Sequence, residues 1–255
     1  MGEHAPVLAG LRRILSAVVA IALPSRCPGC GVVVQADHSF CLDCWRSLDF
    51  LGRPACAVCA VPLALAFDSD SRCGACLADP PPYDRVRAAV AYGAIARALA
   101  LKLKYGRRPG IAVTMARHIR RAAGGALAGA LVVPVPLHRR RLWARGYNQA
   151  ALIARALIRE QAAEGGELAV DLLRRRRNTP MLRGLGRSAR ARAVQGAFAV
   201  RAADRVRGRE VVLIDDVFTT GATARACAQA LKRAGATRVT VLCWARVVHE
   251  DDGVR

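Results

Sequence analysis

Two adjacent aspartates, Asp215 and Asp216, follow an apolar run in the segment VVLIDDVFTTGAT, residues 211–223. The loop after them consists of small residues and leads into a predicted helix. Backbone N–H groups at a helix N-terminus, together with threonine hydroxyls, favour an anion, whereas the carboxylates repel a phosphate that touches them. A ligand that suits both features has a phosphate at one end and neutral hydroxyls nearby. Ribose 5-phosphate has that shape, with its phosphate in the loop and its 2′ and 3′ hydroxyls on the carboxylates.

Other interpretations of this segment fit less well. A Walker B acid pair needs a Walker A loop, and the chain contains no Gly-Lys pair. The stretch GLGRSA, residues 184–189, matches GxGxxA, but it follows an arginine-rich segment rather than a strand, so we interpret it as a chance match. A purely structural strand–turn–helix has no need of two carboxylates at the end of a strand.

Eight of the ten cysteines form four CxxC pairs. Two thiolates two residues apart grip one face of a tetrahedral ion, and a second pair completes a four-cysteine site. We predict two structural Zn²⁺ sites with sequential pairing of the first four and the last four cysteines; nested pairing and disulfides are the alternatives. Cys227 and Cys243 stand alone in apolar patterns, which indicates buried thiols. The predicted zinc ligands are Cys27, Cys30, Cys41, Cys44, Cys56, Cys59, Cys73 and Cys76.

Positive charge dominates the 255-residue chain, with 40 lysines and arginines against 19 aspartates and glutamates and a net charge of +21. Such an excess is typical of proteins that bind a polyanion, whether nucleic acid or clustered phosphates. A solvated basic surface is the alternative. Basic clusters occur at residues 139–141, 174–177 and 183–192.

The N-terminus imitates a signal peptide, because arginines precede an apolar run at residues 14–23. That run is shorter than the roughly 20 apolar residues of a transmembrane helix. Export would also carry the paired cysteines into an oxidising compartment. We therefore expect an apolar helix that packs on the protein, no membrane span and a cytoplasmic location.

Strands and helices alternate after the cysteine pairs. Residues 130–136, 168–173, 211–214 and 238–245 predict strands, and residues 95–105, 111–122, 147–160 and 222–234 predict helices. Strands that are apolar throughout indicate a parallel sheet in an α/β fold, with helices on both faces. Ligands bind such sheets beyond the carboxyl ends of the strands, which is where the two aspartates are expected.

Two segments carry a resemblance to a known family. VVLIDDVFTTGAT resembles the phosphoribosyl pyrophosphate signature of type I phosphoribosyltransferases, and VVPVPLHRRRLWARGYNQA, residues 132–150, is similar to the pattern of their competence-associated branch, the ComF/GntX family. The resemblance implies a type I phosphoribosyltransferase-like parallel sheet flanked by helices and preceded by a small zinc-ribbon module with four-cysteine sites. The implied parts are an apolar N-terminal helix at residues 1-25, a double zinc ribbon at 26-80 and a phosphoribosyltransferase-like domain at 85-250.

The resemblance also implies roles for particular residues. Asp215 and Asp216 would hold the ribose diol of phosphoribosyl pyrophosphate. Arg190 falls at the arginine position of the family's mobile loop, where Leu182 and Ala193 replace a glutamine and an asparagine; these replacements put catalysis more in question than ligand binding. The 5-phosphate loop and the pyrophosphate segment comprise Thr219, Thr220, Gly221, Ala222, Thr223, Arg145 and Gly146.

The implied reaction is displacement at C1 of the ribose, with pyrophosphate leaving and Mg²⁺ neutralising its charge. Asp215, Asp216 and Arg190 would stabilise the charges that develop, and no sequence feature identifies the acceptor. An alternative hypothesis is a basic single-stranded-DNA-binding protein in which the phosphoribosyl site is regulatory or inactive, since the resemblance implies work on incoming DNA in natural transformation. Lys104 lies either on a solvated helix face or, as the family pattern has a lysine in this region, toward a phosphate.

Overall fold

The computed structural model describes residues 24–65, 68–160, 166–177 and 187–248, so the predicted N-terminal helix lies outside the described residues. The chain divides into two compact units, residues 1–47 and 48–255. The four cysteines from Cys56 to Cys76 therefore belong to the same unit as the sheet. The sequence had grouped all four CxxC pairs in one module at residues 26-80.

The first unit contains one short helix in its described part. Helix α2 (Leu42–Arg46) begins after Cys41, whose side chain accepts a hydrogen bond from the backbone N–H of Cys44. A β-bridge joins Arg26 and Val33 on either side of the first CxxC turn.

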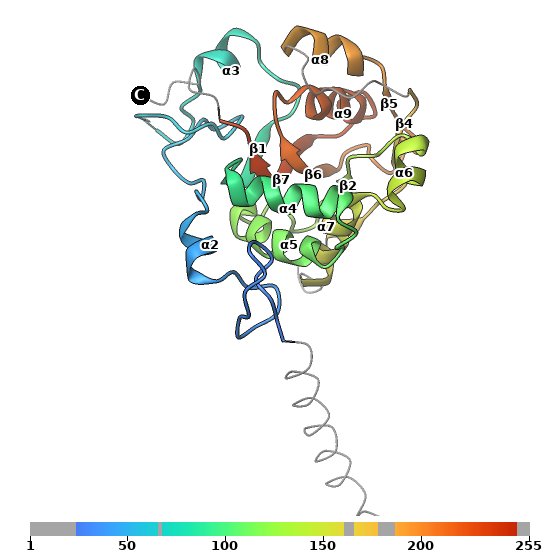
Figure 1. Cartoon of the computed structure of the whole chain (residues 1–255). Coiled ribbons are helices and arrows are strands. Elements are labelled where there is room, and N and C mark those ends of the chain that lie inside the picture. Colours follow the sequence, from blue (N-terminus) through green and yellow to red (C-terminus); the bar gives the residue numbers. More distant parts are fainter. Residues whose placement is uncertain (1–23, 66–67, 161–165, 178–186, 249–255) are drawn as a thin grey trace, which may run out of the picture. The chain divides into compact units, whose positions relative to one another are not determined.

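The second unit is built on a parallel sheet of five strands in the order β1-β7-β6-β2-β3. Strands β1, β7, β6 and β2 are labelled in Figure 1. Its strands are β1 (Arg85–Ala91), β2 (Leu131–Pro134), β3 (Glu167–Leu168), β6 (Glu210–Phe218) and β7 (Arg238–Arg246). Strands β4 (Leu173–Arg175) and β5 (Phe198–Val200) form a separate antiparallel hairpin. The helices are α3 (Gly74–Ala78), α4 (Ala94–Tyr105), α5 (Ile111–Ala123), α6 (Arg139–Arg145), α7 (Gln149–Glu160), α8 (Arg187–Val194) and α9 (Ala222–Arg233).

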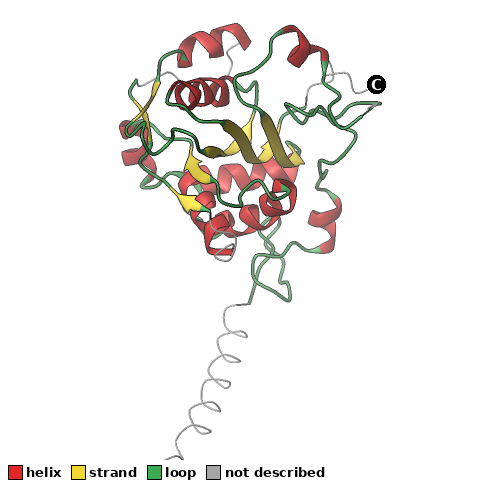
Figure 2. Cartoon of the chain, turned by 180° about the vertical axis from the view of Figure 1, so that it is seen from behind, coloured by secondary structure: helices red, strands yellow, loops and turns green. Residues whose placement is uncertain are grey.

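Helices cover both faces of this sheet, as Figures 1 and 2 show. Helices α5 and α7 pack on β1, β7, β6 and β2 on one face, and α9 packs on β6 and β7 on the other. The central strands are apolar on both sides because both sides are covered; Leu213 and Val241 are fully buried. Trp244 is also fully buried, and its indole N–H donates to the Ala96 carbonyl of α4 at 3.1 Å.

The predicted fold class is confirmed: a parallel sheet is flanked by helices and preceded by a cysteine-rich module. The predicted burial of Cys227 and Cys243 is also confirmed. In the described part of the chain, no helix has the length and apolar character needed to cross a membrane.

Three local predictions were wrong or incomplete. The segment 168–173 is not one strand, because β3 ends at Leu168 and β4 begins at Leu173. Edge strand β1 was not predicted, since its arginines interrupt the apolar pattern. Strand β6 continues through both aspartates to Phe218, whereas the sequence predicted its end at Ile214.

Candidate functional site

Residues 219–223 comprise the loop after β6 and the first two residues of α9; they are called the phosphate loop below, after the role expected from the sequence. Gly221 caps α9 in the left-handed region with φ +76°, and a Cβ there would lie 2.7 Å from the Phe218 ring. Both the backbone conformation and the close contact therefore require glycine. The buried hydroxyl of Thr220 has no hydrogen-bond partner among the described residues, so the loop holds a hydroxyl whose hydrogen-bonding capacity is unused.

Asp215 lines the same small cavity as the phosphate loop, with a volume of about 30 Å³. Its Oδ1 accepts a hydrogen bond from the Asp216 N–H at 2.9 Å. Burial, and then the negative charge of Asp216, raise the pKa of Asp215 to about 7. The loop therefore has beside it a carboxyl group that changes charge near neutral pH.

Asp216 is buried and has a different environment from Asp215. Its Oδ2 lies 2.6 Å from the Lys104 ammonium, and the Asp216 side chain is 4% exposed. Burial lowers the pKa of Lys104, but the attraction of Asp216 outweighs burial and raises it. Successive residues of a strand point to opposite faces, which explains why Asp215 lines the cavity while Asp216 meets the last turn of α4. Lys104 is therefore not on a solvated helix face, and its role toward a phosphate stays a prediction.

The predicted pyrophosphate segment, Arg145 and Gly146, joins α6 to α7 next to the end of α4. Gly146 ends α6 in the left-handed region. The Arg145 guanidinium lies 5.0 Å from the centroid of the Tyr105 ring and donates to the Gln149 side chain at 3.0 Å. Tyr147 donates to the Leu103 carbonyl at 2.5 Å. The last turn of α4 therefore contacts this segment through Leu103 and Tyr105, and Asp216 through Lys104.

A second, larger cavity of about 770 Å³ lies between the start of α7 and the β4–β5 hairpin. We call it the basic cavity, because six arginines and a single carboxylate line it. Burial and then the charge of Arg141 lower the pKa of Arg175, and the charge of Asp215 opposes them, so this cavity lies within electrostatic reach of Asp215. Its charged lining residues are Arg139, Arg155, Arg174, Arg175, Arg176, Arg201 and Asp171.

Arg190 belongs to α8, and its side chain lies outside what the structure describes. Leu182 falls in the segment 178–186, which is also outside the described residues. The sequence did not single out Lys104 as a partner for Asp216, nor Arg175 as a cation near Asp215. In the sequence, the signal that could have identified Arg175 was the run of arginines that follows the predicted strand at residues 168–173.

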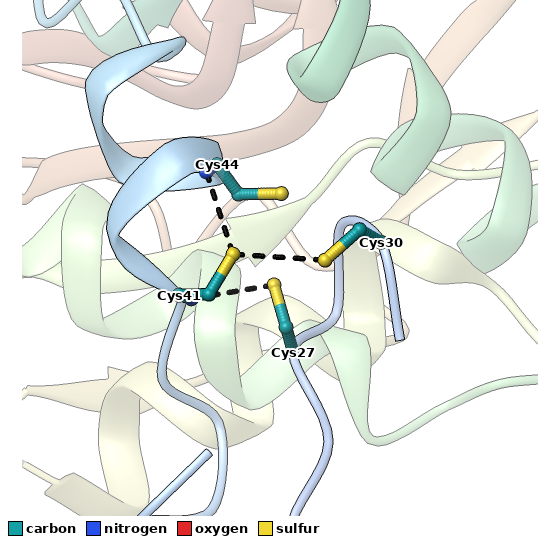
Figure 3. Close-up of side chains that lie close together, drawn as sticks. All are labelled: Cys27, Cys30, Cys41 and Cys44. Carbon is teal, nitrogen blue, oxygen red and sulfur yellow. Dashed lines mark hydrogen bonds between the residues drawn. The ribbon is translucent and has the colours of Figure 1, made fainter. Parts of the chain in front are cut away.

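The eight cysteines of the CxxC pairs gather into two separate groups of four, each with its sulfurs within 4.8 Å of one another. Sequential pairing is therefore confirmed. The first cluster comprises Cys27, Cys30, Cys41 and Cys44, whose side chains point to a common centre in Figure 3. The second cluster comprises Cys56, Cys59, Cys73 and Cys76.

The donor set of both clusters fits Zn²⁺. Backbone N–H groups donate to the sulfurs, from Cys41 to Cys27 at 3.4 Å in the first cluster and from Cys73 to Cys56 at 3.3 Å in the second. Hydrogen bonds from Cys59 and then Cys76 lower the pKa of Cys56, which favours its thiolate form. Four sulfurs at this separation match tetrahedral coordination. The structure thus contains two four-cysteine sites suited to structural zinc ions.

Comparisons with known proteins found the following similarities. Residues 18–77 match the family model described as a double zinc ribbon domain. The DNA utilization protein YhgH of Escherichia coli is 34% identical over 236 residues, covering 89% of this chain and all of that protein. Competence protein F of Haemophilus influenzae is 28% identical, covering 87% of this chain and 96% of that protein. The crystal structure of TT1426 from Thermus thermophilus is 20% identical, with a TM-score of 0.33 over 55% of this chain and 84% of that one.

Fold and site together define a zinc-ribbon protein whose parallel α/β domain carries a glycine- and threonine-containing loop at the carboxyl end of its central strand. The sequence identity with YhgH and with competence protein F extends over nearly the whole length of those proteins, which assigns the family. This chain belongs to the ComF/GntX family.

The Lys104–Asp216 pair is expected to stabilise the fold. Lys104→Met leaves the two adjacent carboxylates of β6 without their cation, so we expect it to lower the free energy of unfolding by about 2 kcal/mol. The lysine side chain is 23% exposed, which keeps this loss below the cost of breaking a fully buried pair. Urea unfolding followed by circular dichroism measures the change. Arg97→Met, an exposed cation on the same helix, is the matched control. Equal midpoints for the two variants would contradict a stabilising pair.

Each cysteine cluster is expected to bind one zinc ion independently. Elemental analysis of the purified protein should give two zinc ions per chain. Cys41→Ser, in the first cluster, and Cys73→Ser, in the second, should each reduce the content to one, because three remaining thiolates hold the metal much more weakly. If a single substitution removed both ions, the two sites would not be separate.

Proposed function

We propose that this protein binds phosphoribosyl pyrophosphate at the phosphate loop and acts in the utilization of DNA. The observation that carries the proposal is the shared cavity of the loop and Asp215. Gly221 turns the loop in the left-handed region, the Thr220 hydroxyl has unused hydrogen-bonding capacity, and α9 begins at the same place. A 5-phosphate suits the loop, and the ribose hydroxyls suit the carboxylates of β6.

The proposed sugar site uses the two aspartates differently. Asp215, which lines the cavity, accepts hydrogen bonds from the ribose hydroxyls. Asp216 approaches the ribose from the side of α4 and is oriented by the Lys104 ammonium at 2.6 Å. This cation keeps two adjacent carboxylates compatible with a ligand that carries several negative charges.

The pyrophosphate is proposed to lie toward Arg145 and Gly146. The backbone there bends sharply at Gly146, and the charge of Arg145 reaches the Lys104–Asp216 pair. Mg²⁺ would arrive with the substrate, since it is held mainly by phosphate oxygens and water. In a transfer reaction the bond from C1 to the pyrophosphate oxygen breaks as the acceptor bonds to C1. The protein's part is to position the ligand, offset charge and exclude water.

Titration calorimetry with phosphoribosyl pyrophosphate and Mg²⁺ tests the site. Asp215→Ala is expected to weaken binding about 100-fold, because two charge-assisted hydrogen bonds to the sugar are removed. Asp204→Ala, an exposed carboxylate in the turn before β6, should bind like the wild type. Undiminished affinity in Asp215→Ala would rule out the proposed sugar site.

The raised pKa of Asp215 predicts a pH dependence of binding. A pKa of about 7 means that the carboxyl group is largely neutral at pH 6 and ionised at pH 8. Because the ionised form is the stronger acceptor, affinity should fall about tenfold from pH 8 to pH 6 beyond the change caused by the ligand's own titration. Asp215→Asn supplies the correction, since it responds to the ligand's titration alone. Parallel pH profiles for the two proteins would contradict this assignment.

The basic cavity favours a second candidate function, the binding of single-stranded DNA. Two of the arginine clusters found in the sequence converge there, at Arg139 and at residues 174–176, and Arg155 and Arg201 join them. Such a concentration of charge suits a chain of phosphates. The names of the relatives, a DNA utilization protein and a competence protein, agree with work on DNA.

The salt dependence of oligonucleotide binding measures this second function. Removing one arginine–phosphate pair lowers the slope of log affinity against log salt by about 0.7 for single strands. Arg174→Gln/Arg176→Gln removes two such arginines and should therefore reduce the slope by about 1.4. Arg97→Gln/Arg233→Gln removes the same charge from exposed positions of α4 and α9 and should leave the slope nearly unchanged. Equal slopes for both double variants would place DNA binding elsewhere or nowhere.

A further inference from the structure

Arg246, the last residue of β7, is a buried cation placed between the second cysteine cluster and the phosphate loop. It is 6% exposed. Its Nη1 donates to the Cys59 carbonyl at 2.6 Å, and its guanidinium lies 5.1 Å from the centroid of the Phe218 ring. One side chain therefore contacts both a zinc-ligand residue and the residue that precedes the phosphate loop.

No carboxylate in the described ranges forms an ion pair with Arg246, and its Nε has no hydrogen-bond partner there. Burying a cation costs free energy unless a negative charge offsets it. The second cluster offers that charge, because Zn²⁺ with four thiolates has a net charge of about −2. The Cys59 carbonyl, which belongs to a ligand residue of that cluster, accepts the 2.6 Å hydrogen bond from Arg246. The guanidinium and the cluster are thus close enough to interact electrostatically.

Phe218 transmits this contact to the phosphate loop. Its ring meets Tyr83 edge-on, with centroids 6.0 Å apart, and the Val247 N–H donates to its carbonyl at 2.9 Å. A Cβ on Gly221 would lie 2.7 Å from the same ring. The position of the Phe218 ring therefore limits where the backbone of the loop lies.

Further packing links the second cluster to the sheet domain. The residues packed on it include Val58, which also packs on the main core of the sheet, and Val248, two residues after Arg246. Arg225 on α9 adds a nearby link, since it donates to the Asp79 carbonyl at 2.7 Å just after α3. The segment of the second cluster thus contacts both the core of the sheet and α9, the helix that follows the phosphate loop.

We propose that metal binding by the second cluster, relayed through Arg246 and Phe218, holds the phosphate loop in the shape that binds the 5-phosphate. Arg246 is then a positioning residue, and the second zinc ion is a requirement of the ligand site. The inference rests on the proposed binding of phosphoribosyl pyrophosphate. Because coupling between two sites is reciprocal, the ligand should in turn make the second zinc ion harder to remove.

Calorimetry on three arginine variants of the zinc-loaded protein tests the positioning role. Arg246→Met is expected to bind phosphoribosyl pyrophosphate at least tenfold more weakly. Arg246→Lys, which keeps the charge but loses the planar group over the ring, should fall between Arg246→Met and the wild type. Arg238→Met changes the exposed arginine at the other end of β7 and should bind normally. Circular dichroism and zinc content identify any variant that fails to fold.

Zinc release to an excess of a coloured chelator gives the second measurement. In the wild type the ligand should slow the release of one of the two ions, and Cys73→Ser, which lacks the second site, should lose this slow phase. Arg246→Met should release one ion faster without ligand, and the ligand should no longer protect it. If the ligand protects both ions equally, or if Arg246→Met binds as the wild type does, the inference is wrong.

The two proposals fail in distinguishable ways. A wild type that does not bind phosphoribosyl pyrophosphate overturns the proposed function, and with it the relay to a ligand. Faster zinc release from Arg246→Met in that case still identifies the arginine as the counter-charge of the second cluster. A wild type that binds, with Arg246→Met unaffected, overturns the relay alone.

Discussion

The ion pair between Lys104 and Asp216 is the interaction on which the proposed site depends. A carboxylate that is almost completely buried next to another carboxylate needs a cation, and the last turn of α4 supplies it at 2.6 Å. The same turn supports the segment of Arg145 through the Tyr105 ring and the Leu103 carbonyl. This ion pair therefore links the central strand β6 to α4, which precedes it in the chain by about a hundred residues. Through α4 it also links β6 to the proposed pyrophosphate segment.

The parts of this fold that the sequence predicted are those encoded over short distances. The spacing of the CxxC pairs located both metal sites, and the apolar runs located the central strands with the loop after them. Strand β1 was missed because Arg85 and Arg87 break its apolar pattern. The pairing of Lys104 with Asp216 was missed because both residue types are also common on solvated surfaces, so only the tertiary structure brings them together. The different orientations of the two aspartates were missed because the predicted strand ended before them.

The excess of positive charge is organised rather than spread evenly. Several arginines at the surface pair with carboxylates, as Arg205 and Arg209 do with Glu167, and such exposed pairs contribute little to stability. The basic cavity differs, since a single aspartate faces six arginines there. Repulsion among like charges in a concave surface costs free energy that an anionic ligand removes. A ligand with several negative charges would offset these six arginine charges together.

Although the two cysteine clusters look like copies of one motif, their neighbourhoods differ. Gly29 is required in the first cluster, where a Cβ would lie 2.7 Å from the Cys44 sulfur; the second cluster has Val58 at the same place in its CxxC turn, and this valine packs on the main core. Loss of metal from the first cluster removes the centre that holds its own four cysteines. Loss of metal from the second also disturbs side chains that pack on the interior of the sheet domain.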